Sequence, residues 1–162
     1  MDLCLSSEST GDYAESVFRI LVVDDECSIR ELIVETLGEA GYAVESAASA
    51  MEALEKLHGQ HHDLLLTDYH MPRKTGLELI SQIRAEGLDI PTVLMTGRTA
   101  ELLAEHPDLK VSVVLPKPFM LEELLGVLSN VLGSNKLIQA PAVPSECHLA
   151  DHTGFNVMGR RY

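Results

Sequence analysis

The fold of this chain is decided by the stretch Leu64-Leu65-Leu66-Thr67-Asp68-Tyr69-His70-Met71-Pro72. Three leucines and a threonine make an apolar run that is too short for a helix and is typical of a buried strand. The run stops at a carboxylate, and Pro72 cannot continue a central strand. We therefore expect Asp68 at the carboxyl end of a strand, where open α/β sheets bind their ligands.

Apolar runs and helical patterns alternate on both sides of this strand. Strands are predicted over residues 18–23, 42–47, 64–68, 91–95 and 110–115. Three helices are predicted to begin at capping motifs, S/T-x-x-E in type, and to end near a glycine; they open at Ser28, Ser49 and Thr75 and close at Gly41, Gly59 and Gly87. Two more helices are expected over residues 99–105 and 121–132. Five such alternations predict a parallel sheet with helices on both faces.

Composition narrows the class of protein. The chain has 162 residues, of which 46% are hydrophobic and 4% aromatic, so we expect one domain with an aliphatic core. A formal net charge of −13 disfavours direct binding to nucleic acid or to anionic lipid. No apolar run approaches the roughly 18 residues of a membrane span. Three scattered cysteines without a CxxC pair are typical of a reducing compartment, so we expect a cytoplasmic protein.

The two ends of the chain differ in composition from its middle. Residues 1–17 are rich in Ser, Glu, Asp and Thr and carry no signal-peptide pattern, so we expect a flexible arm. Residues 133–162 contain Pro141 and Pro144 and show no sustained period. We expect a flexible tail that is too short for an output domain. The domain itself is predicted over residues 18–132.

Polar side chains gather where the predicted strands end. The first strand is followed by Asp24 and Asp25, the third ends at Asp68, the fourth at Thr96, and Lys117 follows the fifth. In a parallel sheet these ends share one edge. Neighbouring carboxylates repel one another unless a cation neutralises them, and Mg²⁺ prefers oxygen ligands. A lysine and a hydroxyl add donors for an anion, so the cluster suits phosphoryl transfer onto a carboxylate.

These motifs resemble a known family. The chain is similar to the receiver domain of two-component response regulators over about residues 18–132, through Val22-Val23-Asp24-Asp25, Thr67-Asp68-Tyr69-His70-Met71-Pro72 with Gly76, Leu94-Met95-Thr96-Gly97 and Lys117-Pro118-Phe119. The resemblance implies a flavodoxin-like, doubly wound α/β fold. Its five parallel strands would have the order 2-1-3-4-5 and would be accompanied by five helices.

The resemblance also implies roles for individual residues. Asp68 would be the phosphoacceptor. Asp25 and Asp68 would bind Mg²⁺ directly, Asp24 would do so mostly through water, and the backbone carbonyl of His70 would supply a further oxygen.

Two further residues would contact the phosphoryl group. Thr96 would donate a hydrogen bond to it and Lys117 would pair with it, and the bond between Lys117 and Pro118 would be cis.

The implied function is that of a stand-alone receiver in a phosphorelay. The phosphoryl donor would be the phosphohistidine of a sensor histidine kinase or of a histidine phosphotransfer protein. Output would pass through contact with an unidentified protein or through onward transfer, without direct contact to nucleic acid or membrane. The only chemistry would be self-phosphorylation and self-dephosphorylation at Asp68, so we do not expect an enzyme.

Three positions depart from the family pattern or vary within it. Val114 stands where family members often carry Tyr or Phe, and a valine cannot make the aromatic swing that usually signals phosphorylation. His70 and Arg98 stand at positions that influence the lifetime of the phosphoryl group. We hypothesise that both border the phosphoryl pocket and screen the phosphoaspartate from water.

Other functions are compatible with the sequence. A receiver fold could act as a constitutive, unphosphorylated binding module, which Val114 keeps open. An aspartyl-phosphate phosphohydrolase is less favoured because His70 stands where such enzymes usually carry a second carboxylate. A flavin carrier is disfavoured because the acid cluster would repel the flavin phosphate. A metal site at His58, His61 and His62 is disfavoured because no second ligand cluster accompanies them.

Overall fold

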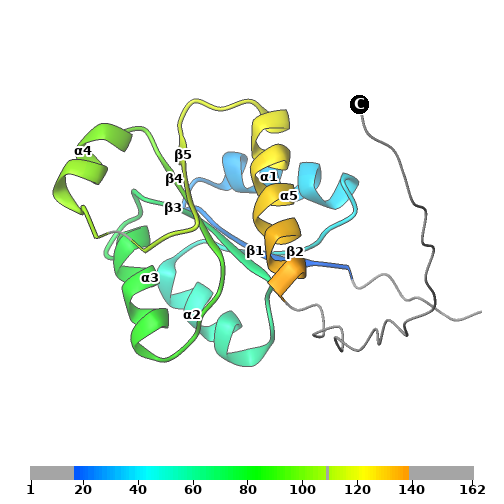
Figure 1. Ribbon diagram of the computed structural model, residues 1–162, viewed down its shortest axis with the longest axis horizontal. Coiled ribbons are helices and arrows are strands. Elements are labelled where there is room, and N and C mark those ends of the chain that lie inside the picture. Colours follow the sequence, from blue (N-terminus) through cyan, green and yellow to red (C-terminus); the bar gives the residue numbers. More distant parts are fainter. Residues whose placement is uncertain (1–16, 109, 139–162) are drawn as a thin grey trace, which may run out of the picture.

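Figure 1 shows a computed structural model of the chain, which describes residues 17–108 and 110–138. Five parallel strands form one sheet in the order β2-β1-β3-β4-β5, and five helices alternate with them along the chain. The predicted α/β class, strand order and number of helices are therefore confirmed. The strands are β1 (Arg19–Val23), β2 (Ala43–Ala47), β3 (Leu64–Asp68), β4 (Thr92–Thr96) and β5 (Val113–Pro116). The helices are α1 (Cys27–Glu39), α2 (Ala50–Gly59), α3 (Gly76–Ala85), α4 (Thr99–Glu105) and α5 (Leu121–Ile138).

Alternate strand residues build two aliphatic cores, one on each face of the sheet, as the period of two in a strand requires. On one face Val22 and Leu66 pack against apolar residues of α1 and α5, such as Leu37 and Leu128. On the other face, the core contains strand residues such as Leu65 together with residues of α2, α3 and α4. Figure 1 shows α1 and α5 on the opposite side of the sheet from α2 and α3. This two-sided burial explains why β3 reads as a continuous apolar run.

Two of the three predicted capping motifs are confirmed. The side chain of Ser49 accepts a hydrogen bond from the backbone N–H of Glu52, and Thr75 forms a complete capping box with Glu78. The motif at Ser28 was wrong. Helix α1 begins one residue earlier, at Cys27, and its N-terminal flanking residue Glu26 makes no side-chain cap.

Several boundaries differ from the predictions. The strand predicted over 110–115 starts only at Val113, because the preceding residues lie in the connection from α4. Leu32 belongs to the apolar positions of α1 but is 50% exposed. Helix α5 continues six residues beyond the expected boundary at Leu132, as far as Ile138.

The predictions for the two ends of the chain lie largely outside the described residues. They are the flexible arm over residues 1–17, of which only residue 17 is described, and the flexible tail over residues 133–162, of which residues 133–138 belong to α5. In the part of the chain that the structure describes, no helix is long and apolar enough to cross a bilayer.

Candidate functional site

The carboxyl edge of the sheet brings together three of the predicted residues. Lys117 follows β5 and lies between two carboxylates. Its Nζ is 2.7 Å from Oδ1 of Asp68 and 3.4 Å from Oδ2 of Asp24. These residues are separated by 44 to 93 positions in the chain, so only the parallel order of the strands makes them neighbours.

Asp24 is the most deeply buried carboxylate of the site, with 1% of its surface exposed. The backbone N–H of Glu26 donates a 2.8 Å hydrogen bond to its Oδ1. Burial raises the pKa of Asp24, and the nearby charge of Asp68 adds to that shift, although Glu26 and Lys117 partly offset it. The ionised form of Asp24 is therefore unfavourable in this environment. That is expected of a carboxylate that binds a cation.

The position of Lys117 is set by the backbone around it. Its N–H donates a 2.7 Å hydrogen bond to the carbonyl of Thr96, and its bond to Pro118 is cis, as predicted. Burial disfavours the charge on the ammonium, but hydrogen bonds and charges from Asp68 and then Asp24 outweigh burial and raise the pKa of Lys117. The lysine is thus held protonated against Asp68.

Asp68 is 6% exposed and is positioned by close backbone packing. The N–H of Tyr69 donates to the carbonyl of Met95, and the N–H of Gly76 donates to the carbonyl of Tyr69, which ties the end of β3 to β4 and to the start of α3. A Cβ atom on Gly76 would lie 2.3 Å from the backbone oxygen of Asp68. Only glycine lets α3 approach Asp68 this closely.

Thr96 and Arg98 lie at the same edge, at the end of β4. Thr96 is fully buried, and its Oγ1 accepts a 3.1 Å hydrogen bond from the backbone N–H of Arg98. The hydroxyl hydrogen of Thr96 remains free to rotate toward a ligand. The guanidinium of Arg98 is exposed and pairs with Glu101 on α4. That pairing raises the pKa of Arg98 and offsets its charge.

Asp25 and His70 lie at the surface of this edge. Both side chains are exposed. The ring of His70 meets that of Tyr69 edge to face, with centroids 4.6 Å apart. Neither side chain forms a hydrogen bond or ion pair with Asp24, Asp68 or Lys117, so their predicted roles remain predictions.

The donor set fits Mg²⁺. No group of three or more His, Cys, Asp or Glu side chains that could hold a metal by itself is found within residues 17–108 and 110–138. Mg²⁺ does not need one, because it binds through one or two carboxylates and keeps several waters. Asp24 and Asp68 supply two hard oxygen donors whose combined charge one lysine does not balance. Asp25 follows Asp24 directly in the chain.

The three histidines of the disfavoured metal site, His58, His61 and His62, each lie beside a different acid. His58 contacts Glu86 at 2.6 Å and His61 contacts Asp63 at 3.3 Å. His62 is buried, and its Nε2 lies 3.5 Å from a carboxylate oxygen of Glu45.

One contact of the site escaped the sequence analysis. Nη1 of Arg30 on α1 donates a 2.7 Å hydrogen bond to the backbone carbonyl of Asp24. The available signal was a basic residue six positions after the carboxylate, at helical spacing from the buried residues of α1. Its meaning depends on the rotation of the helix about its axis, which the sequence pattern places only coarsely.

The chain matches the family model of the response regulator receiver domain over residues 20–129. The chain belongs to this family. The matched range contains every residue of the site described above.

Individual relatives agree with this assignment. The chain is 41% identical over 129 residues to the response regulator MprA of Mycobacterium ulcerans, which covers 78% of this chain and 55% of that protein. It is 35% identical to the chemotaxis response regulator CheY4 of Vibrio cholerae, with a TM-score of 0.67, covering 72% of this chain and 99% of that one. It is also 35% identical to the response regulator TrrA of Thermotoga maritima in complex with Mg²⁺ and BeF, with a TM-score of 0.63, covering 71% and 99% of the two chains.

The chain spans about half the length of the curated relatives it matches. The comparisons thus show that the chain contains a receiver domain of two-component signalling. The activity of a whole regulator is a matter for proposal.

Proposed function

We propose that this chain is a receiver that accepts a phosphoryl group onto Asp68. The observation that carries the proposal is the position of Lys117, whose ammonium bridges the carboxylates of Asp68 and Asp24 at the carboxyl edge of the sheet. A protonated lysine in this place can neutralise the charge that a phosphoryl group brings to Asp68.

The step is a displacement at phosphorus. A carboxylate oxygen of Asp68 forms the new P–O bond while the P–N bond to the donor histidine breaks, and the electron pair of that bond returns to the imidazole. Lys117 pairs with a phosphoryl oxygen, and the hydroxyl of Thr96 donates to another. Bound Mg²⁺, held by Asp25 and Asp68 with the carbonyl of His70 and by Asp24 through water, would neutralise the remaining charge.

The donor is a phosphohistidine of a sensor histidine kinase or of a histidine phosphotransfer protein, a source that the family membership supports. Output through contact with another protein or through onward transfer is our proposal for the described part of the chain. The acidic balance of −13 supports a protein partner over nucleic acid. We also propose a cytoplasmic location and no enzymatic activity beyond the chemistry of Asp68.

A constitutive binding module is the second candidate, and Val114 favours it. Val114 lies opposite Leu94 on β4 and packs against the same core cluster as Tyr69. A valine there cannot report phosphorylation by the rotation of a ring. In that case Asp68 would stay unmodified, and the domain would bind its partner through a surface that does not change.

The test is intact-mass analysis after incubation with acetyl phosphate and Mg²⁺. We expect a gain of about 80 Da in the wild type, one phosphoryl group, and no gain in Asp68→Asn or in the presence of EDTA. Asp89→Asn is the matched control, because Asp89 is 93% exposed and remote from the site, and it should be labelled like the wild type.

Failure of the folded wild type to gain mass, from acetyl phosphate and from a phosphohistidine donor alike, would contradict the proposal and favour the binding module. Labelling of Asp68→Asn at the wild-type rate would contradict the choice of acceptor.

A further inference from the structure

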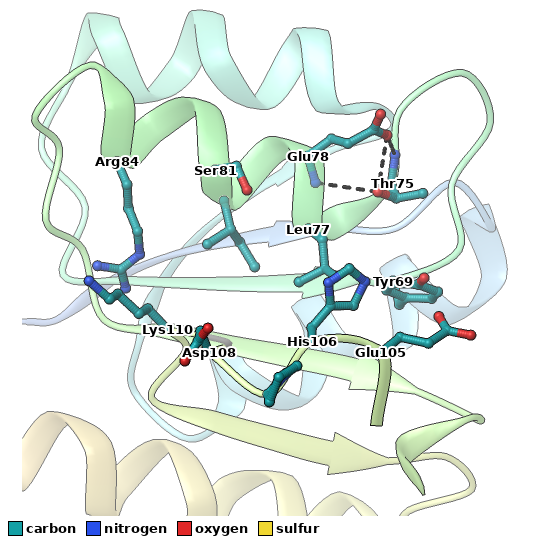
Figure 2. Close-up of a pocket in the computed structure, with 12 residues that line it drawn as sticks. Tyr69, Thr75, Leu77, Glu78, Ser81, Arg84, Glu105, His106, Asp108 and Lys110 are labelled. Carbon is teal, nitrogen blue, oxygen red and sulfur yellow. Dashed lines mark hydrogen bonds between the residues drawn. The ribbon is translucent and has the colours of Figure 1, made fainter. Parts of the chain in front are cut away.

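A hollow lies on the α3 side of the domain, between α3 and the connection from α4 to β5 (Figure 2). Its volume is about 540 Å³, within the range of sites that bind small molecules. Leu77, Ile80 and Pro107 contribute apolar surface to its lining. Tyr69, the residue directly after the acceptor, forms part of its wall.

Charged groups are distributed unequally along this hollow. Figure 2 shows Arg84 of α3 and Lys110 at one end, and Tyr69 and Glu105 at the other. Asp108 is the acid at the cationic end, and its side chain is exposed to solvent, which screens its charge.

Arg84 and Lys110 form few strong interactions with other residues of the protein. Lys110 forms no ion pair with any residue of 17–108 or 110–138. Arg84 contacts Asp89 through Nη1 at 3.1 Å, but Asp89 is 93% exposed, so the pair contributes little. The Nε–H of Arg84 is buried without a hydrogen-bond partner among the described residues. A buried donor without an acceptor lowers the stability of the fold, unless a small shift of the Arg84 side chain brings the N–H to an acceptor.

The third carboxylate that lines the hollow, Glu78, is already hydrogen-bonded within the protein. Glu78 accepts hydrogen bonds from the backbone N–H and the hydroxyl of Thr75 in the capping box of α3. The backbone hydrogen bond from Thr75 lowers the pKa of Glu78. This acid is therefore held away from the cations at the far end of the hollow.

From this arrangement we infer that the hollow binds a small organic anion with an apolar or aromatic body. The carboxylate or phosphate of the ligand is held by the guanidinium of Arg84 and the ammonium of Lys110. Its body packs on Leu77 and Ile80 and reaches toward the ring of Tyr69. A planar guanidinium and a carboxylate form paired hydrogen bonds, which gives the anion a defined orientation.

The test is a set of two-dimensional NMR titrations of Asp68→Asn in EDTA at constant ionic strength. Without a competent acceptor or Mg²⁺, the outcome does not depend on phosphorylation. Benzoate and phenyl phosphate are the anionic probes and separate carboxylate from phosphate ligands. Benzyl alcohol and benzylamine are the neutral and cationic counterparts of similar size.

We expect saturable shifts with one or both anions at the Arg84 Nε–H and at the amides of Tyr69 and Lys110. Dissociation constants should be millimolar for probes of this size. Arg84→Gln and Lys110→Gln should each weaken binding at least about tenfold, the loss of one charge-assisted contact. Arg19→Gln is the matched control, because Arg19 lies on β1, outside the lining of the hollow, and should bind like the parent.

Equal binding of benzyl alcohol or benzylamine would overturn the inference, because the hollow would then not select anions. Absence of saturable shifts with both anions would overturn it as well. Lys110 is exposed, so Lys110→Gln should fold even if Arg84→Gln does not, and undiminished anion binding by that variant would also count against the proposed site.

Discussion

Replacing Gly76 with alanine should destabilise the domain through one contact. The new Cβ would lie 2.3 Å from the backbone oxygen of Asp68 and 3.0 Å from Cδ1 of Leu94. Cβ atoms essentially never approach other atoms within 3.0 Å, so the first distance is short by 3.0 − 2.3 = 0.7 Å. The leucine methyl can rotate away, but the oxygen belongs to the backbone of a central strand. Helix α3 must therefore move away from β3.

We expect this displacement to lower the free energy of unfolding by about 2–3 kcal/mol, the usual cost of overpacking a well-packed core. With a urea m-value of about 2 kcal/mol/M, the midpoint of unfolding should fall by about 1 M or more. The assay is urea denaturation followed by far-UV circular dichroism. Labelling by acetyl phosphate should also slow, because the end of β3 carries Asp68, the proposed acceptor.

Gly38→Ala is the matched control. Gly38 lies in α1 and is exposed, and a Cβ atom added there would meet no other atom within 4 Å. The same chemical change should there raise the free energy of unfolding by about 0.5–1 kcal/mol, because alanine favours the helix. If Gly76→Ala unfolds at the wild-type midpoint or above it, the packing argument for Gly76 is wrong.

Three further predictions concern the site. Because burial raises the pKa of Asp24 above 3.8, its ionised form destabilises the fold, and this loss appears as the pH rises through the folded pKa. Asp24→Asn should therefore be more stable than the wild type at pH 7 by about 1 kcal/mol, with the difference shrinking toward pH 3 in urea titrations. The pKa of Lys117 is raised above 10.5, so its contribution to stability is present below that pH and is lost at higher pH. Lys117→Met should show less alkaline loss than the wild type between about pH 10 and 12, and an unchanged loss would count against the ion pair. His70→Ala and Arg98→Ala should each shorten the half-life of the phosphoaspartate, measured by mass spectrometry; if neither does, the screening hypothesis fails.

Local sequence patterns predicted a helix or strand correctly where a single feature of the sequence, such as an apolar run or a capping motif, determines it. The apolar run of β3 and the capping box at Thr75 were confirmed, because a buried strand and a helix start each leave a direct mark on the sequence. The motif at Ser28 failed because a serine and a glutamate at the right spacing fit a helix interior equally well. Helix α1 begins before Ser28, and the buried Asp24 takes the hydrogen bond of Glu26 instead.

The exposure of Leu32 shows a second limit of prediction from the sequence. It lies one position before Ile33 and five before Leu37, so it stands at the edge of the apolar stripe, and half of it is exposed. The face of a helix that packs on a sheet is narrower than the apolar stripe in the sequence. Which edge of the stripe is covered depends on the angle at which the helix crosses the strands.

By itself the sequence determined the five alternating strands and helices, and with them the edge at which Asp24, Asp68, Thr96 and Lys117 should meet. That result follows from local rules, since each strand end carries its own polar residue and parallel strands end at one edge. Only the tertiary structure decided which of these groups touch. Lys117 lies against Asp68 and Asp24, Arg30 binds the carbonyl of Asp24, and Asp25 stays at the surface. The physical reason is that contact depends on sheet twist, helix rotation and the packing of distant segments, and no short stretch of sequence contains these.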